Sequence, residues 1–315
     1  MKGLFIVTRT NEMHKHYESF TCLGNEVQLY TYDHRADLNK WAKGAALDAE
    51  VLAAVKEYSP DVIVYVGACK GNSPSPACFK SLRDFAPTVH FCSDAADEPW
   101  WEELITFDRV GSFNVQVALD GNKNWPLHNT QITALTPIDP ACFPNPPTPH
   151  ADRSVYFGFA GNVGSVSKLK DGRVVGRRPL VAAMMEFGLQ VRQRDHESFK
   201  DTYPQAAKYM ADCRITPNFP ATGSYDRMHV KGRVVETGLA GAMLLEQAGS
   251  PTPDWFEKGV DYLEWATMAE AKAIVDKYIR LPEETQAFGE RLRAKVMAKH
   301  SPEVFWGNIF QRCGL

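Results

Sequence analysis

The sequence predicts an α/β protein built from two Rossmann-like domains, and three observations support this fold class. Short apolar runs alternate with longer amphipathic stretches in both halves of the 315-residue chain. The apolar runs are hydrophobic throughout, which is typical of parallel strands that helices cover on both faces. A proline-rich segment, residues 136–150, separates the two halves. We therefore expect two domains of ordinary size that bind a ligand in a cleft.

The first half, residues 1–135, contains two clear helical patterns. The clearer one is Ala45–Tyr58, and the Ser59-Pro60-Asp61 sequence after it stops a helix before the next strand. A second helix is predicted at Ser75–Phe85. The strands are predicted at Leu4–Thr8, Glu26–Tyr30, Val62–Val66, Thr88–Cys92, Arg109–Gly111 and Gln131–Ala134.

The second half, residues 151–299, repeats the alternation. Ahead of it, residues 136–150 contain six prolines, and proline cannot continue the hydrogen-bond ladder of a helix or a sheet. A polar glycine loop, residues 161–168, follows the first strand of this half. Strands are predicted at 154–160, 190–194, 214–216, 242–246 and 262–265, and helices at 178–187, 205–212, 231–240, 269–280, 282–299 and 302–311.

The composition is that of a globular protein without a strongly charged surface. Apolar residues make up 44% and charged residues 23%, and the formal net charge is −3, so no basic surface argues for nucleic acid. The longest apolar runs, such as Leu4–Val7, are too short for a bilayer or a signal peptide, so we expect a cytoplasmic protein without a transmembrane segment. Seven cysteines form no C-x-x-C pair, and no closely spaced Cys and His residues indicate a zinc site.

The most informative motif is Lys231-Gly-Arg233-Val-Val-Glu236, which starts a predicted helix. Lys231 and Arg233 can neutralise a diphosphate, and the planar fork of arginine matches phosphate geometry. Glu236 lies three residues after Arg233, about one helical turn, so the two side chains share a face. A carboxylate there can accept both hydroxyls of a ribose. The motif indicates a nucleotide-sugar site, and the alternative is a solvated helix with an ordinary ion pair.

Six segments of the chain form an ordered pattern. They are Leu135–Phe143, Val155–Asn162, Arg177–Leu180, Ala211–Asn218, Lys231–Glu236 and Trp255–Gly259. In this order they resemble the GT-B glycosyltransferases, and most closely the bacterial group of spore-maturation-type or group 1 transferases. The resemblance is good over residues 155–300 and diffuse over 1–130. It implies two Rossmann-like domains that face a cleft, with a C-terminal helix, residues 300–315, that crosses back to the first domain.

The resemblance also implies roles for individual residues of the donor site. Glu236 would bind the ribose of a nucleotide-sugar donor, and Lys231 and Arg233 would hold its diphosphate. Many relatives carry a second glutamate eight residues before the ribose glutamate, and here that position is Met228. The residues expected to bind the donor nucleotide are Gly161, Asn162, Arg178, Asn218, Lys231, Arg233 and Glu236.

The expected chemistry needs no fixed metal and no other cofactor. In GT-B enzymes, cations and backbone N–H groups at helix starts stabilise the charge that develops on the leaving diphosphate. Lys231 and Arg233 are therefore expected to be catalytic. The other transferase fold binds a divalent ion through a D-x-D motif, and no Asp in this chain is followed two positions later by another Asp.

The acceptor side is less specific in sequence. Asp94 follows the predicted strand Thr88–Cys92 and is either a general base, a hydrogen-bond partner of the sugar or acceptor, or part of a helix N-cap. His14 and His16 follow the first strand, where some inverting relatives keep a catalytic histidine, and the alternative is an exposed loop histidine. The acceptor is expected to be a glycan, a lipid, a protein or a small molecule, and the sequence does not choose among these four.

Two other functions fit the same architecture. A nicotinamide-dependent dehydrogenase shares Rossmann-like domains, but the G-x-G-x-x-G fingerprint is absent. A non-catalytic two-domain protein that binds a sugar or a nucleotide also has two α/β lobes, and the Lys231–Glu236 motif argues against it. The leading prediction is a glycosyltransferase that uses a nucleoside-diphosphate sugar. Contacts to the base are expected near Arg192–His196, where nothing separates uridine from guanosine or thymidine.

Overall fold

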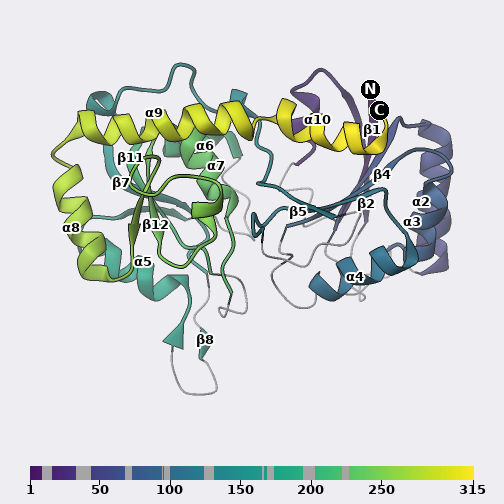
Figure 1. Cartoon of the computed structure of the whole chain (residues 1–315), viewed down its shortest axis with the longest axis horizontal. Helices are drawn as coiled ribbons and strands as arrows, with labels where there is room; N and C mark the ends of the chain where they lie inside the picture. Colours follow the sequence, from purple (N-terminus) through teal and green to yellow (C-terminus); the bar gives the residue numbers. More distant parts are fainter. Residues whose placement is uncertain are drawn as a thin grey trace. The chain divides into compact units, whose positions relative to one another are not determined.

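The computed structural model describes the chain as two compact units. Unit 1 comprises Met1–Asp139 and Pro302–Leu315, and unit 2 comprises Pro140–Ser301. Both are α/β, with a parallel sheet and helices packed on it (Figure 1), so the predicted fold class is confirmed. The described residues are 1–8, 16–32, 44–67, 73–93, 95, 100–123, 131–164, 167–168, 174–193, 203–221 and 227–315.

Unit 1 is built on a six-stranded parallel sheet. Its strand order is β2-β1-β3-β4-β5-β6, so the chain runs outward from β1 in both directions. Val62–Val66 and Thr88–Cys92 have the predicted bounds because each is a short, wholly buried apolar run between turn residues. The strands are β1 (Lys2–Thr8), β2 (Glu26–Tyr32), β3 (Val62–Val66), β4 (Thr88–Cys92), β5 (Val115–Ala118) and β6 (Gln131–Thr133).

Successive side chains of these strands enter two different cores. Leu4 and Ile6 pack with the helices α2 (Ala45–Tyr58), α3 (Pro76–Leu82) and α4 (Trp100–Val110). Phe5 and Val7 point to the other face, which α1 (Glu18–Thr21) and α10 (Pro302–Cys313) cover. This alternation explains why the strands are apolar throughout.

The C-terminal helix α10 belongs to unit 1. Trp306 is fully buried there and donates a hydrogen bond from its indole Nε1 to Ser19 Oγ at 3.0 Å. Its ring also meets Phe20 edge-on, with the centroids 4.8 Å apart. The last residues of the chain therefore complete the core formed by the first residues.

One predicted strand of unit 1 is wrong. Arg109 and Val110 are the end of helix α4, and Gly111 follows with a φ of +72°, a conformation that glycine tolerates. The next strand is β5, Val115–Ala118, which is fully buried. The short segment Arg109–Gly111 carries no periodicity of its own, and the structure continues the amphipathic helix α4 through Val110.

Unit 2 carries a five-stranded parallel sheet in the order β10-β7-β11-β12-β13. Helices α5, α8 and α9 share one apolar core with it, and α6 and α7 pack against β7, β11 and β12. A short antiparallel pair, β8 (Ser167–Lys168) with β9 (Val174–Val175), was not predicted. The strands are β7 (Val155–Gly161), β10 (Gln190–Gln193), β11 (Cys213–Asn218), β12 (Met243–Gln247) and β13 (Leu263–Trp265). The helices are α5 (Arg177–Met185), α6 (Tyr203–Asp212), α7 (Gly232–Leu239), α8 (Met268–Tyr278) and α9 (Pro282–Lys299).

Helix α7 is fixed along its length by close packing. A Cβ atom on Gly238 would lie 2.7 Å from a methyl of Val296, so a glycine is needed where α7 meets α9. The carbonyls at the C-terminal end of α7 accept hydrogen bonds from two buried side chains. Arg153 Nη2 donates to Ala240 O at 2.9 Å, and His150 Nε2 lies 2.7 Å from Gly241 O. The Arg153 cation at this end complements the helix dipole.

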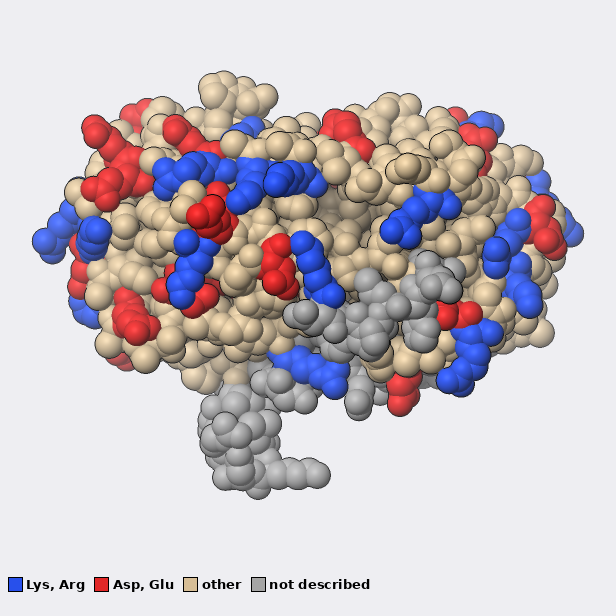
Figure 2. Space-filling model, viewed as in Figure 1, with Lys and Arg blue, Asp and Glu red and all other residues tan. Residues whose placement is uncertain are grey.

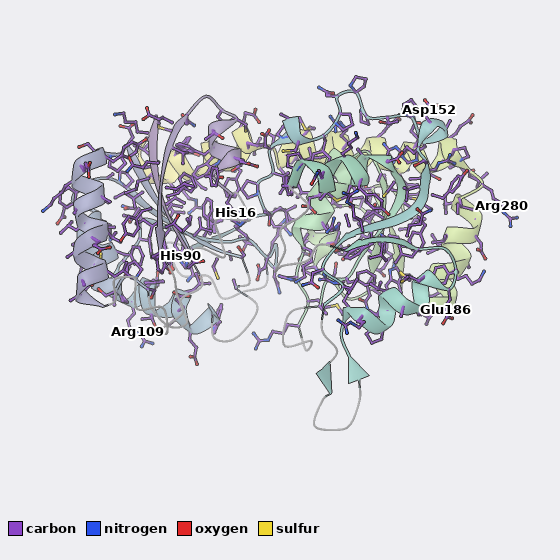
Figure 3. All side chains as sticks on the ribbon, turned by 180° about the vertical axis from the view of Figure 1, so that it is seen from behind. His16, His90, Arg109, Asp152, Glu186 and Arg280 are labelled. Carbon is purple, nitrogen blue, oxygen red and sulfur yellow. The ribbon has the colours of Figure 1, made fainter. Side chains whose placement is uncertain are left out.

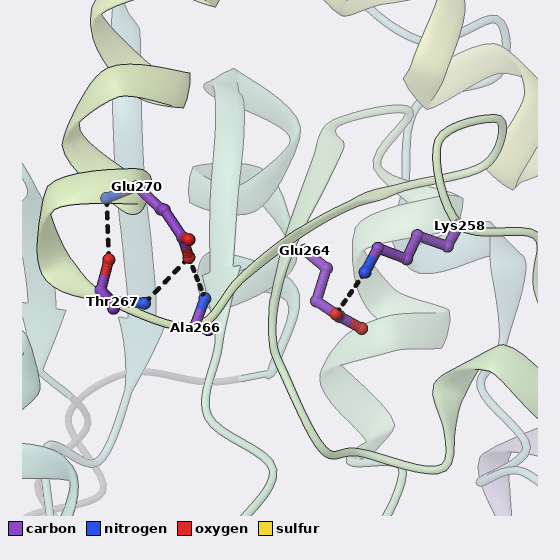
Figure 4. A network of polar contacts seen from close by, with 5 residues as sticks. All are labelled: Lys258, Glu264, Ala266, Thr267 and Glu270. Carbon is purple, nitrogen blue, oxygen red and sulfur yellow. Dashed lines mark hydrogen bonds and ion pairs between the residues drawn. The ribbon is translucent and has the colours of Figure 1, made fainter.

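Helix α8 begins with a reciprocal cap, which Figure 4 shows. Thr267 Oγ1 accepts from the backbone N–H of Glu270 at 3.2 Å, and the Glu270 carboxylate accepts from Thr267 N at 3.1 Å. Nearby, Lys258 and Glu264 form an ion pair of 2.6 Å. The two contacts between Thr267 and Glu270 satisfy backbone N–H groups at the start of α8 that have no helical partner.

The surface has no single dominant charge on the face drawn in Figure 2, where basic and acidic side chains are interspersed. This pattern agrees with the small net charge of the chain. Within the described ranges, no helix has the length and apolar character needed to cross a membrane.

Candidate functional site

The described residues of the predicted donor site gather at one edge of the unit 2 sheet. Gly161 ends β7 and Asn218 ends β11, and these two strands are neighbours in the sheet. Helix α7 starts at Gly232 with Lys231 as its half-buried N-cap residue. The carboxyl edge of a parallel sheet is where such folds bind ligands. The structure therefore brings Gly161, Arg233 and Glu236 together.

Arg233 and Glu236 form an ion pair on the first turns of α7. Arg233 Nη1 lies 3.3 Å from Glu236 Oε2, and the side chains are only 15% and 12% exposed. The alternative interpretation of an ordinary ion pair is thus correct about the contact. It is wrong about the surroundings, because this pair is largely shielded from water.

The guanidinium of Arg233 is held from three more sides. Its carbon lies 5.1 Å from the centre of the Phe159 ring, a cation–π distance, and Nη1 lies 2.6 Å from Met210 Sδ. A Cβ atom on Gly161 would lie 2.8 Å from Nη2, so only glycine leaves room for the guanidinium. Among the described residues, Arg233 Nε has no hydrogen-bond partner. The side chain is therefore positioned but retains donor capacity for an anion.

Tyr203, the first residue of α6, lies near enough to the same carboxylate to sense its charge. Burial and the charge of the nearby Glu236 carboxylate raise the pKa of Tyr203 well above its ordinary value. The sequence analysis missed this residue because nothing local links it to Glu236. A usable signal was its place at the start of a helix that follows the carboxyl end of a strand.

The glycine loop after β7 is shaped by Asn162 and Arg177. Asn162 Oδ1 accepts from the backbone N–H of Gly164 at 2.7 Å, which closes a tight turn. Arg177 Nη1 donates to the carbonyl oxygen of Asn162 at 2.7 Å. Arg178, the arginine chosen from sequence, has an exposed side chain. Its role as a donor ligand stays a prediction, while Arg177 is the arginine that the structure places beside the loop.

Asn218 binds a buried carboxylate that the sequence analysis did not consider. Its Nδ2 donates to both oxygens of Glu246, at 3.1 and 2.9 Å, and both residues are buried. Burial raises the pKa of Glu246 to about 7, and hydrogen bonds from Asn218, Ser250 and Thr252 oppose this rise. The amide of Asn218 is therefore engaged within the protein. The sequence signal for Glu246 was a charged residue that continues the apolar run Met243–Leu245.

Met228 lies just before α7, at the position where many relatives of the resembled family carry the second glutamate. It forms an isolated bridge with Ala221, and a Cβ atom on Gly249 would lie 3.2 Å from its sulfur. A thioether cannot accept a strong hydrogen bond from a sugar hydroxyl. The side chain at this position is thus not equipped to take over the role of the second glutamate.

The acceptor-side residues of unit 1 are described only in part. Asp94 and His14 lie outside the described residues. His16 is only 7% exposed and meets the Phe91 ring edge-on at 6.4 Å, so its interpretation as an exposed loop histidine is wrong (Figure 3). His90, also labelled there, is wholly buried on β4, and this burial lowers its pKa to about 4. The ring stacks on Tyr65 at 5.2 Å, which indicates a core histidine.

A surface pocket of ≈ 830 Å³ runs beside α6 in unit 2. Its lining includes the cations Arg192 and Lys208, the ring of Tyr209 and the thiol of Cys142. Arg192 belongs to the segment 192–196 that was predicted to lie near the nucleotide base, and residues 194–196 fall outside the described part of the chain.

Several solved structures share the fold of the whole chain. HepE of Anabaena in complex with UDP-glucose has a TM-score of 0.57 and 13% identity, over 99% of this chain and 98% of that one. Sucrose-phosphate synthase of Thermosynechococcus elongatus has a TM-score of 0.60 and 10% identity, over 99% of both chains. An α-glucosyltransferase in complex with UDP and a mismatched DNA has a TM-score of 0.65 and 11% identity, over 100% of both chains. The chain therefore has the GT-B fold.

A protein-family model also matches part of the chain. A family model described as "Glycosyl transferase-like" matches residues 166–311, which include the whole Lys231–Glu236 motif. Both this match and the fold of the whole chain are those that the sequence segments predict for a GT-B glycosyltransferase. The sequence comparison with curated proteins finds no match. Membership of the spore-maturation-type group stays a prediction.

Proposed function

We propose that the chain transfers a sugar from a nucleoside-diphosphate sugar to an acceptor, with unit 2 as the donor-binding domain. The observation that carries this proposal is the shielded Arg233–Glu236 pair at the start of α7, against the glycine that ends β7. It offers a cation for a diphosphate beside a carboxylate for a ribose. HepE was solved with UDP-glucose and the α-glucosyltransferase with UDP, which supports the same class of donor here.

Donor binding would exchange the internal ion pair for contacts with the nucleotide. Glu236 would accept the two ribose hydroxyls, and the fork of Arg233 would turn to the diphosphate. Because both side chains are already largely shielded from water, this exchange costs little further desolvation. It replaces one set of charge-assisted hydrogen bonds with another.

The leaving group would be stabilised without a fixed metal. Negative charge grows on the β-phosphate as the bond to the sugar breaks. Lys231 and Arg233 would balance it together with the first backbone N–H groups of α7, which have no acceptor within the helix. Preorganised donors of this kind act mainly in the transition state.

On the acceptor side, we propose unit 1 as the acceptor-binding domain. Asp94 is our candidate for the general base or for a hydrogen-bond partner of the transferred sugar. Its assignment is supported by its place in the sequence, two residues after the end of β4, and by the family resemblance. The acceptor is a nucleophile whose chemical class the described residues do not restrict.

Thermal-shift measurements with nucleoside diphosphates test the proposal. We expect at least one of UDP, GDP and dTDP, at about 100 times its Kd, to raise the melting temperature by about 5 °C in excess EDTA. Hydrolysis of the matching sugar donor should also persist in the chelator. Stabilisation by NAD and by no nucleoside diphosphate would favour the dehydrogenase instead. Binding that requires added manganese would show that the metal-free scheme is wrong.

A further inference from the structure

Two arginines beside the end of β7 share one aromatic ring. The guanidinium carbon of Arg233 lies 5.1 Å from the centre of the Phe159 ring, and that of Arg177 lies 5.8 Å from the same centre. Both distances are within the range of a cation–π contact. Phe159 is only 2% exposed and meets Phe219 edge-on at 5.5 Å, so its ring is fixed by its neighbours. One buried ring therefore sets the positions of two cations that come from different helices.

Two further contacts hold the Arg177 side chain in place. Its Nη1 donates to the carbonyl oxygen of Asn162 at 2.7 Å, and its guanidinium carbon lies 6.0 Å from the centre of the Phe219 ring. A carbonyl oxygen is a neutral acceptor, so this hydrogen bond orients the cation without cancelling its charge. Arg177 is half-buried, so a ligand at the carboxyl edge of the sheet can reach it.

Two like charges beside one ring favour an anionic ligand. Groups that are shielded from water repel each other more strongly than groups in bulk solvent. Arg233 is paired with Glu236 at 3.3 Å, and the proposed function gives this carboxylate to the ribose when the donor binds. The two guanidiniums then need an anion that serves both of them. A diphosphate carries negative charge on each of its two phosphate groups, so it meets this need.

The contacts also define an order of groups along the site. Glu236 contacts Arg233, which lies over the Phe159 ring. The same ring is the platform of Arg177. A nucleoside diphosphate has a matching order, because its ribose is followed by the α-phosphate and then by the β-phosphate. With the ribose at Glu236, Arg233 meets the phosphates from the ribose side, and Arg177 meets the terminal phosphate.

From this arrangement we infer that Arg177 binds the terminal phosphate of the donor and that, together with Arg233, it makes the site select nucleoside diphosphates over nucleoside monophosphates. The inference rests on the proposed role of Glu236 in ribose binding. A monophosphate reaches Arg233 but not Arg177, so it forfeits the charge-assisted hydrogen bonds of the second arginine. The loss of such bonds weakens binding about tenfold or more. Removal of the Arg177 guanidinium should therefore lower this selectivity and not merely the affinity.

Calorimetric titration with matched nucleotide pairs tests this role. The probes are UDP with UMP, GDP with GMP, and dTDP with dTMP, and the pair to follow is the one whose diphosphate binds the wild type best. We expect the wild type to prefer the diphosphate about tenfold or more. In Arg177→Gln we expect this preference to fall to about threefold or less, with the monophosphate affinity nearly unchanged. Arg177→Lys restores the charge without the planar fork, so its preference should lie between these two values.

Arg291→Gln is the matched control in the same unit. Arg291 makes the same two kinds of contact as Arg177. Its guanidinium carbon lies 4.7 Å from the centre of the Phe288 ring, and its Nε donates to the carbonyl oxygen of Val260 at 2.6 Å. It belongs to α9, so its replacement should leave the diphosphate preference at the wild-type value. Thermal melts of the variants would show that any difference in binding is not a difference in folding.

Three results would overturn the inference. An unchanged ratio of affinities in a folded Arg177→Gln protein would show that Arg177 does not bind the terminal phosphate. Equal weakening of both nucleotides would show that it only supports the loop through Asn162. A wild type that binds the monophosphate as well as the diphosphate would also contradict the inference.

Glu236→Gln separates this inference from the proposed function. If Glu236→Gln weakens both nucleotides while Arg177→Gln keeps the wild-type ratio, only the Arg177 inference fails. If Glu236→Gln keeps the wild-type affinity for both nucleotides, the proposed function of Glu236 fails. If no nucleoside diphosphate binds the wild type, both proposals fail.

Discussion

Glu236 and Glu246 are two carboxylates of unit 2 that are shielded from water in different ways. Glu236 is 12% exposed and has a cationic partner, Arg233, at 3.3 Å. Glu246 is wholly buried, and its hydrogen-bond partners among the described residues are neutral donors, which include Asn218 Nδ2 at 2.9 Å. Because neutral donors replace only part of the hydration of a charge, burial raises the pKa of Glu246 to about 7.

The comparison shows how partners separate a binding carboxylate from a structural one. A nucleotide can replace the ion pair between Arg233 and Glu236, because its ribose hydroxyls can bind the Glu236 carboxylate and its phosphates can bind the Arg233 guanidinium. No ligand can reach Glu246, whose hydrogen bonds tie the end of β11 to the loop that follows β12. Glu236 is therefore expected to control binding and turnover, and Glu246 to control stability.

The largest effect should come from the cation of the Arg233–Glu236 pair. Arg233→Ala removes a donor that stabilises the departing diphosphate, and we expect kcat to fall about 100-fold or more. Arg233→Lys keeps the charge but loses the planar fork, so it should also impair turnover, though less. Steady-state kinetics on the folded variants measures both. An intact kcat with only a modest rise in KM in Arg233→Ala would mark Arg233 as an ordinary cation of the helix.

The pH dependence of stability should come from Glu246. The pKa of Glu246 is raised from 4.5 in the unfolded chain to about 7 in the folded protein. The contribution of Glu246 to the free energy of unfolding is therefore fully present below pH 4.5 and is lost as the pH rises through 7. The loss amounts to about 3 kcal/mol of unfolding free energy. Denaturant unfolding at pH 4.5 and 8 should show a smaller difference for Glu246→Gln than for the wild type. Equal differences in the two proteins would contradict the assignment.

A smaller loss of turnover is expected from Gly161→Ala, which disturbs the position of Arg233. The added Cβ would lie 2.8 Å from Arg233 Nη2, and this flexible end of the side chain would give way before the backbone does. We expect donor hydrolysis to slow about tenfold, because the Arg233 guanidinium is displaced. This loss is smaller than the loss expected from Arg233→Ala, which removes the guanidinium. The matched control is Gly188→Ala, because a Cβ there meets nothing within 4 Å while φ is likewise positive. Similar losses in both variants would indicate backbone strain alone.

Local signals in the sequence predicted much of the fold and part of the site. Helices α2 and α9 have the predicted bounds because Ser59-Pro60 and Pro282 mark where a helix ends or begins. Arg233 and Glu236 were paired correctly because their contact lies within one helical turn. The Asn218–Glu246 hydrogen bond and the influence of Glu236 on Tyr203 join different elements, so no spacing in the sequence encodes them. The choice between Arg177 and Arg178 depends on a rotation of α5 that the sequence pattern does not specify.

Nucleotide affinity in the two glutamate variants tests the central claim most directly. Calorimetry with the nucleoside diphosphate that binds the wild type best should show a loss of about tenfold or more in Glu236→Gln, because hydrogen bonds to a charged acceptor disappear. Glu246→Gln, studied at pH 8 where it is folded, should bind with the wild-type Kd. Wild-type affinity in a folded Glu236→Gln protein, or an equal loss in both variants, would contradict the claim that Glu236 is the ribose ligand.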